Sequence, residues 1–187
     1  MIGALILGGI VLLCIIITIS LYNGLVRSRN NVQNGWNQID VQLKRRYDLI
    51  PNLVETVKGY AKHEKDVLEN VTKARNTAMA AQSQGRAGQI QAEAQLGQAL
   101  VSLMAVAEAY PDLKANQNFL KLQEELTSTE NKIAFARQYY NDSVMAYNNK
   151  RQEFPGVIVA GMFNFKDEPY WKIEDAAQRE VPKVSFT

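Results

Sequence analysis

The hydrophobic pattern opens with an unbroken apolar run from Ile2 to Tyr22, which contains no Asp, Glu, Lys, Arg or His. As a helix with a rise of ~1.5 Å per residue, the run would span about 31 Å, close to the hydrocarbon thickness of a bilayer. Thr18 and Ser20 are its polar side chains, and both can bond back to their own helix. The pattern predicts a transmembrane anchor over residues 1–26.

A cleaved signal peptide is the first alternative to an anchor. Such peptides carry a basic region, a shorter apolar stretch and a small-x-small exit. Here no Lys or Arg precedes the run, and it ends in Leu-Tyr-Asn-Gly-Leu-Val, so an uncleaved anchor is favoured. The lone cysteine, Cys14, follows the large Leu13 rather than a small residue, so we expect an ordinary lipid-facing thiol. One cysteine forms no intrachain disulfide.

After the anchor, apolar residues recur at spacings of three and four, which is the period of amphipathic helices. The first helix continues from the anchor, and Pro51 is expected to end or kink it. Three more helices are expected over about 52–81, 89–110 and 115–149. The helix over about 52–81 has the heptad spacing of a coiled coil. The fold class is therefore all-α: an N-terminal transmembrane helix leading into an antiparallel bundle of four long helices over 27–150.

The last segment, 151–187, has a different composition, because it holds three of the five prolines and many apolar side chains. That is not the composition of a solvated tail. It should dock on the bundle's own groove, on a neighbouring subunit or on the membrane surface. The candidate contacts between copies in a homo-oligomer are Phe154, Val157, Ile158, Phe163, Phe165, Tyr170 and Trp171.

Basic residues gather after the anchor. The stretch from Arg27 to Arg75 carries ten Lys/Arg against six Asp/Glu. Excess Lys/Arg marks the cytoplasmic flank of a span. We therefore expect a single-pass inner-membrane protein with its N-terminus outside and its C-terminal domain cytoplasmic, with the opposite topology as the alternative. Contact with anionic lipid head groups is equally compatible with this charge. The membrane-proximal basic set is Arg27, Arg29, Lys44, Arg45 and Arg46.

Residues suited to chemistry are few. His63 is the single histidine, and the carboxylates beside it, Glu64 and Asp66, alternate with lysines as on a solvated helix face. Glu130 and Arg137 lie two turns apart and fit a buried structural pair or exposed charges better than catalysis. No phosphate-binding glycine loop, zinc-protease motif or basic–aromatic nucleic-acid motif is present. We expect no enzyme activity, no catalytic, cofactor-binding or metal residues, no cofactor and no nucleic-acid partner.

Several long strings together resemble the LemA family, and they cover nearly the whole chain. They are Trp36 with Ile39 to Val54, Tyr110 to Asn116, Leu122 to Leu126, Thr129 to Arg137, Tyr139-Tyr140-Asn141, Tyr147-Asn148 and Phe154-Pro155. The resemblance implies a bacterial single-pass membrane protein with a bundle of long helices. Magnetosome proteins of similar sequence are linked to membrane shaping, and genes of this family often neighbour those for membrane proteases or envelope stress. The family supplies no catalytic residues.

Two functional hypotheses follow. The first is a membrane-anchored helical scaffold that self-associates and organises or remodels the bacterial membrane, with the lipid bilayer and further copies as partners. The second is an adaptor that presents a cytoplasmic surface to another membrane protein, such as a protease or an envelope-stress sensor.

Overall fold

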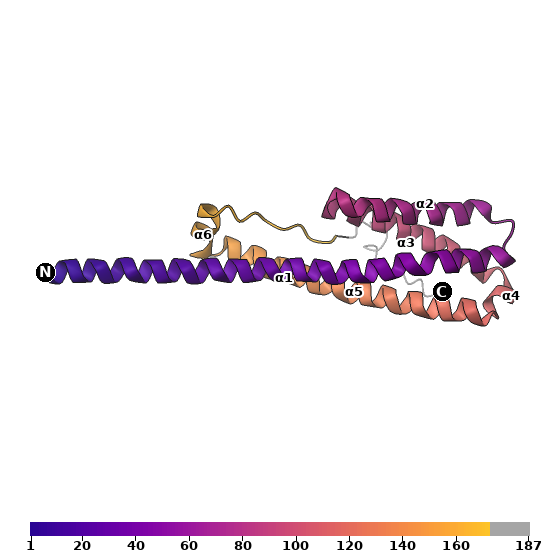
Figure 1. Ribbon diagram of the computed structural model, residues 1–187, viewed down its shortest axis with the longest axis horizontal. Helices are drawn as coiled ribbons and strands as arrows, with labels where there is room; N and C mark the ends of the chain where they lie inside the picture. The colour runs from indigo at the N-terminus through magenta and orange to yellow at the C-terminus, as the bar shows by residue number, and fades with distance from the viewer. Residues whose placement is uncertain (173–187) are drawn as a thin grey trace, which may run out of the picture. The chain divides into compact units, whose positions relative to one another are not determined.

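A computed structural model describes residues 1–172 as helices joined by short turns, with no strand in that range (Figure 1). The all-α prediction is confirmed, as is a long apolar N-terminal helix that leads into further helices. The helices are α1 (Ile2–Tyr60), α2 (Lys65–Ala81), the short 3-10 turn η1 (Gln82–Gln84), α3 (Arg86–Glu108), α4 (Pro111–Lys114), α5 (Gln117–Gln152) and α6 (Gly156–Met162).

The chain divides into two compact units. The first unit combines Met1–Leu53 with Gln117–Tyr170, and so contains most of α1 with α5 and α6. The second contains Val54–Asn116, which includes the last turns of α1 and the helices α2, α3 and α4. The expected boundaries of the anchor, bundle and C-terminal segment remain predictions.

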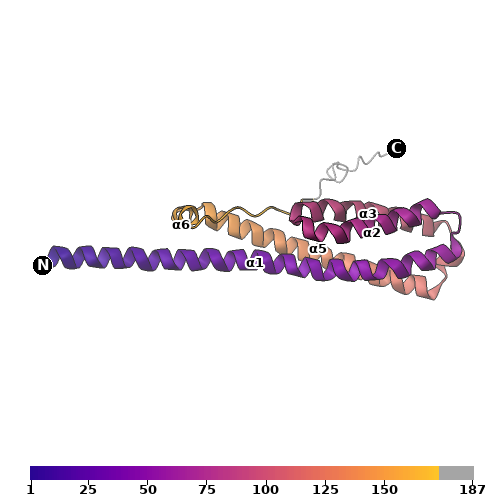
Figure 2. The same cartoon turned by 45° about the horizontal axis from the view of Figure 1, so that its top comes forward.

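In the first unit α1 and α5 pack antiparallel along much of their lengths (Figures 1 and 2). The contacts that fix the direction are Gly24 with Lys150, Trp36 with Tyr140 and Arg46 with Glu130, because the residue number rises on α1 as it falls on α5. A Cβ built on Gly35 would lie 3.0 Å from the Cα of Tyr140. Glycine at this position therefore lets the two backbones approach closely.

The core of the first unit is built from large side chains. Trp36 and Tyr140 meet edge to face, with ring centroids 5.3 Å apart. Side chains of this size each remove a large apolar area from water, at about 25 cal/mol per Å². The helical stripes expected from the sequence are confirmed by the buried residues, which include Val32, Ile39, Leu43 and Tyr47 on α1 and Leu126, Ile133, Val144 and Tyr147 on α5.

The second unit is a helical hairpin with a core of small side chains. The helices α2 and α3 pack on each other and are joined through η1 and Gly85. Gly85 has φ of +85°, a conformation that L side chains rarely adopt, so this turn favours glycine. Alanines are the most frequent buried residues of these helices, namely Ala74, Ala78 and Ala81 on α2 and Ala92, Ala99 and Ala107 on α3, together with Leu68, Val71, Gln89, Glu93, Leu96, Leu100 and Leu103.

Two helix boundaries differ from those expected. Pro51 does not end the first helix, because α1 continues to Tyr60. The lost backbone hydrogen bond is offset by burial of Ile50, Leu53 and Val57 on either side of the proline. A continuous helix over about 52–81 is wrong, because the chain turns at residues 61–64 before α2 begins. Glu64, which interrupts the apolar stripe, marks this turn and accepts a hydrogen bond from the Tyr110 hydroxyl (3.3 Å).

The beginning of the C-terminal segment docks within its own unit. Helix α6 packs on α5. The chain then reverses and runs back along α5 over 165–170 without regular secondary structure. We call this segment the return strand because of its direction, although it belongs to no sheet. Of the three docking alternatives, contact with the chain's own helices is what these residues show. The rest of the expected docking segment, 173–187 with Pro182 and Phe186, lies outside the described residues.

Candidate functional site at the end of the apolar helix

The first part of α1 is a bare apolar helix. No residue in its most apolar 18-residue window is buried. Among the described helices, α1 is the one that is long and apolar enough to cross a membrane. The exposure ends sharply, because Leu25 is fully buried only three residues after Tyr22. The boundary between bare helix and packed unit therefore falls at the end of the apolar run.

Three aromatic rings meet at this boundary, and we call them the aromatic collar: Tyr22, Phe163 and Phe165. The ring centroid of Tyr22 lies 4.8 Å from that of Phe163 and 5.6 Å from that of Phe165, both edge to face. The guanidinium carbon of Arg29 lies 5.2 Å from the centroid of Phe165, which is a cation–π contact. The collar thus ties the segment after α6 to the last turn of the apolar run.

Helix α6 is held against the end of α5 by a close backbone approach. A Cβ at Gly156 would collide with the carbonyl oxygen of Lys150, so only glycine fits without a shift. At its other end Asn164 adopts φ of 54°, and the amide of Phe165 donates to the carbonyl of Ala160 (2.9 Å). A hydrogen bond from a residue to the carbonyl five positions earlier, next to a left-handed residue, is the Schellman motif. This motif turns the chain back toward α5.

The return strand is fastened to α5 by hydrogen bonds from side chains to its backbone. The hydroxyls of Tyr140 and Tyr147 donate to the carbonyls of Pro169 and Lys166, each at 2.7 Å. Asn148 makes two bonds with Glu168, donating to its carbonyl (3.0 Å) and accepting from its amide (3.1 Å). Burial raises the pKa of Tyr147, and the nearby Glu168 carboxylate adds to the effect. The neutral phenol is therefore favoured, which keeps this donor in place.

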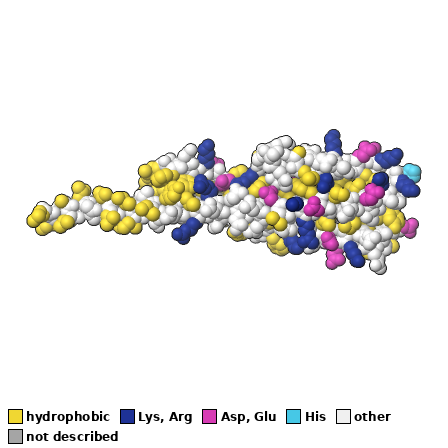
Figure 3. Space-filling view, viewed as in Figure 1, with side chains coloured by type: hydrophobic (Ala, Val, Ile, Leu, Met, Phe, Trp, Pro, Cys, Tyr) yellow, Lys and Arg dark blue, Asp and Glu magenta, His cyan; other side chains and the backbone are white. Residues whose placement is uncertain are grey.

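The outer side of α6 and its flanks is apolar and exposed. In the space-filling view hydrophobic side chains gather there beside α1, and basic side chains lie nearby (Figure 3). The exposed fractions range from 46% for Val157 to 81% for Phe154. The exposed set is Phe154, Val157, Ile158, Met162 and Phe163, and we call it the α6 apolar patch.

The candidate oligomer contacts therefore separate into two groups. Phe154, Val157, Ile158 and Phe163 belong to the exposed patch, and Tyr170 is 38% exposed. Phe165 and Trp171 are each only 6% exposed. The rings of these last two are already covered within one chain.

The predicted basic set also separates. Arg27 and Arg29 are exposed within two turns of Tyr22. Lys44 and Arg45 are exposed too, but they follow Tyr22 by more than twenty residues of unbroken helix, which is about 33 Å at ~1.5 Å per residue. That separation is several Debye lengths at physiological salt. Lys150, which is not in the predicted basic set, lies closer: its ammonium contacts the Gly24 carbonyl and the Ser28 hydroxyl, both at 3.4 Å.

Arg46 is not a surface charge. Its side chain is 5% exposed, and one nitrogen contacts both carboxylate oxygens of Glu130, at 2.9 and 3.2 Å. The structure thus places Arg46 in the interface between α1 and α5. Burial lowers the pKa of Arg137, while Glu130 acts in the opposite direction. Glu130 thus serves as the acceptor of an ion pair between helices.

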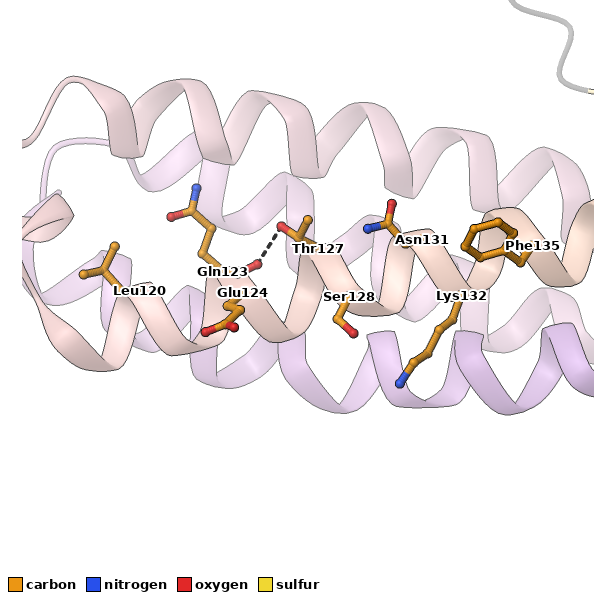
Figure 4. Close-up of a pocket in the computed structure, with 8 residues that line it drawn as sticks. All are labelled: Leu120, Gln123, Glu124, Thr127, Ser128, Asn131, Lys132 and Phe135. Carbon is orange, nitrogen blue, oxygen red and sulfur yellow. Dashed lines mark hydrogen bonds between the residues drawn. The ribbon is translucent and has the colours of Figure 1, made fainter.

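A shallow hollow of about 630 Å³ lies along the outward side of α5 (Figure 4). Leu120 and Phe135 stand at its two ends, with Gln123, Thr127, Asn131 and other polar side chains between them. Phe135 is 71% exposed and Leu120 48%. Among residues 1–172 no group of three His, Cys, Asp or Glu could hold a metal ion. The hollow therefore offers a contact surface with apolar ends and a polar floor.

The residues that build this end of the protein were only partly visible in the sequence. The apolar run and the aromatic tail were both recognised, but their meeting at Tyr22 was not. Within the strings Tyr139-Tyr140-Asn141 and Tyr147-Asn148, the side chains of Tyr140, Tyr147 and Asn148 hold the return strand. The signal in the sequence for this attachment was the pairing of tyrosine and asparagine on the buried stripe of one helix.

Comparisons with known proteins agree with this architecture. The sequence model of the LemA family matches residues 35–186. The protein LemA of Metamycoplasma hominis is 26% identical over 132 residues, which cover 71% of this chain and 60% of that protein. The chain therefore spans less than two thirds of that relative.

Magnetosome proteins are also similar. MamQ 2 of Paramagnetospirillum magneticum and MamQ of Magnetospirillum gryphiswaldense are each 23% identical over 184 residues. These matches cover 86% of this chain and 68% of each relative.

Proposed function

Because the chain belongs to the LemA family, we propose that it is a membrane-anchored helical scaffold that self-associates and organises or remodels the bacterial membrane. The observation that carries the proposal is the continuity of α1 from its bare apolar part into the packed first unit. A helix without a break transmits the position and tilt of the anchor to the packed residues that follow. A flexible linker would not do so.

The proposed orientation places the body in the cytoplasm. Arg27 and Arg29 follow the apolar run closely. Lys150 adds a third positive charge at the same level. This positive flank supports a cytoplasmic body by the positive-inside rule.

Self-association is proposed to occur between parallel anchored copies that pack side by side in the membrane plane. The similarity to proteins named for the magnetosome favours such an organising role. The exposed Leu120 and Phe135 on α5 are the large apolar side chains best placed to contact a neighbour. The proposal assigns the protein no catalytic role, no cofactor and no nucleic-acid partner.

Anchoring is tested by Leu13→Arg, which places a charge in the middle of the exposed apolar run. A charge at a helix centre costs about 2.5–3.5 kcal/mol on insertion scales. We expect less of the variant than of the wild type to be recovered in the carbonate-resistant membrane fraction. Val41→Arg is the control, because Val41 is 64% exposed on the packed part of α1. Equal recovery of Leu13→Arg and wild type in that fraction would contradict a spanning role.

The second candidate function is the adaptor, and the hollow on α5 favours it. Its polar floor between two apolar ends would suit a segment of another membrane protein. If the protein is an adaptor, Phe135→Asp should abolish co-purification of its partner and leave the mass of the protein's own assembly unchanged. If it is a scaffold, the same substitution should reduce the mass of that assembly.

A further inference from the structure

The α6 apolar patch needs an explanation that the packing of the unit does not provide. Helix α6 buries Gly156, Val159 and Ala160 against its own unit. The side chains on its other side remain exposed, and five large apolar groups so close together exceed what scattered surface residues provide. A patch of this kind marks contact with a partner or a lipid surface.

The position of the patch identifies the partner. Phe163 belongs to the patch and also packs on Tyr22, the last residue of the apolar run. Lys150, at the end of α5, contacts the α1 backbone only two residues further, at Gly24. The patch therefore lies at the level along α1 where the apolar run gives way to the packed unit.

We propose that α6 with its apolar patch lies in the lipid interface, dipping into the leaflet from which α1 emerges. This inference rests on the proposed anchoring by α1, because the height of the patch is measured from that span. Apolar faces of interfacial helices bury about 5–10 Å into the boundary between head groups and acyl chains. Tyrosine at the end of the span suits the same boundary.

The charges around α6 fit the head-group region. The segments 22–29, 150–154 and 163–168 meet at this level. Their basic residues are Arg27, Arg29, Lys150, Arg151 and Lys166, against the acidic Glu153, Asp167 and Glu168. Arginine and lysine at this level can reach lipid phosphates while their stems cover apolar surface. The excess of positive charge favours a bilayer that contains anionic lipid.

The depth of α6 is fixed by its attachments. Gly156 seats one end against Lys150, the Schellman turn closes the other end, and the hydrogen bonds from α5 hold the return strand. Two contacts at once, a span and an interfacial helix, restrict the tilt of the first unit relative to the bilayer. Many anchored copies with one fixed tilt could impose a common shape on a membrane.

Depth-dependent quenching tests the proposal on the full chain in vesicles of phosphatidylcholine and phosphatidylglycerol. The label NBD is placed at Ile158→Cys in a Cys14→Ser background. Val41→Cys in the same background is the control in water, and the native Cys14 is the control inside the bilayer. Lipids with a shallow doxyl quencher should quench the Ile158→Cys label several-fold more than the Val41→Cys label.

The outcomes separate the two proposals. Quenching at Cys14 without quenching at Ile158→Cys would overturn the interfacial role and leave anchoring intact. Quenching at neither site would overturn both. An apolar, unquenched environment at Ile158→Cys would show that a second copy or another protein covers the patch, which also contradicts the proposal.

A pair of glycine variants tests whether packing sets the depth. Gly156→Ala should weaken shallow quenching at Ile158→Cys, because its new methyl group displaces α6 from the Lys150 carbonyl. Gly161→Ala is the control, since a Cβ there meets nothing within 4 Å. Circular dichroism checks that both variants stay helical. Equal quenching in the two variants would contradict positioning by Gly156.

Discussion

The two units differ in the size of the side chains that hold them together. The first is built on aromatic and branched residues, with Trp36, Tyr47 and Tyr140 all below 6% exposed. In the second, alanine is the most frequent buried residue of α2 and α3, as at Ala78 and Ala99. Large side chains bury more apolar area each, whereas alanine lets helix backbones come close. The stability of the first unit should therefore fall when a large buried side chain is truncated. The stability of the second should fall when a larger side chain is introduced between its helices.

The difference extends to what each unit exposes. The first unit carries the bare apolar helix, the aromatic collar and the α6 apolar patch, which are the surfaces proposed to meet lipid. The second exposes large apolar side chains such as Val101 and Met79. The first unit thus combines an aromatic core with an exposed apolar surface. This combination suits the proposed role of holding the span at a fixed angle.

The largest expected effect is a truncation in the first unit. Tyr140 is fully buried, meets Trp36 and holds the return strand. Tyr140→Ala should lower the free energy of unfolding by about 3–5 kcal/mol, measured by urea unfolding of the full chain in detergent. Tyr140→Phe keeps the ring and should cost only about 1 kcal/mol. Equal losses for the two variants would mean that the hydroxyl, not the filled space, dominates.

A smaller effect is expected from the ion pair of the same unit. Arg46→Met should cost about 1.5–3 kcal/mol, since it removes a charged hydrogen bond at a buried site. Arg45→Met is the matched control, because the Arg45–Glu125 pair is 4.0 Å long with both side chains about half exposed. It should change stability by less than about 1 kcal/mol. Similar losses at both positions would show that Arg46 is less enclosed than its contacts indicate.

In the second unit the opposite change should be harmful. Ala78 is fully buried, so Ala78→Leu should cost about 1–3 kcal/mol through overpacking, measured by the same unfolding experiment. Ala80→Leu adds the same side chain to an exposed position of the same helix and should be nearly neutral. If Ala78→Leu stabilises the protein, the alanine core contains unfilled space and the contrast between the units fails.

The smallest effect is a dependence on alkaline pH. Burial raises the pKa of Tyr47 to about 12 from its usual 10.0, with Arg46 opposing and Asp40 reinforcing the shift. The neutral phenol stabilises the folded state fully below pH 10.0, and this contribution is lost as the pH rises toward about 12. Tyr47→Phe should therefore lose less stability than wild type between these pH values. Parallel pH profiles would contradict the assignment.

Local patterns predicted the helices better than the turns and the tail. The buried stripes of α1 and α5 follow the helical period, so Leu43 and Ile133 could be placed from the sequence alone. The turn after Tyr60 has neither glycine nor proline at residues 61–64, and only the charge of Glu64 marked it. Pro51 predicted an end or a kink of the first helix. The helix does not end there, because packing around the proline outweighs the loss of one backbone hydrogen bond.

The candidate site was harder to predict because it depends on contacts between distant segments. Tyr22 and Phe163 are far apart in the chain, and no spacing rule brings them together. The burial of Arg46 likewise depends on Glu130 from another helix. Composition indicated that the C-terminal segment must dock, but it could not select the surface. The antiparallel pairing of α1 with α5 makes that selection.

Self-association of the anchored chain is the central claim, and its mass in lipid tests it most directly. The full chain has a mass of 21.0 kDa. Native mass spectrometry of the protein released from lipid nanodiscs should find assemblies of many copies, and Phe135→Asp should shift them toward smaller species. A single species of 21.0 kDa from wild type would contradict the scaffold. One chain bound to a different protein would favour the adaptor instead.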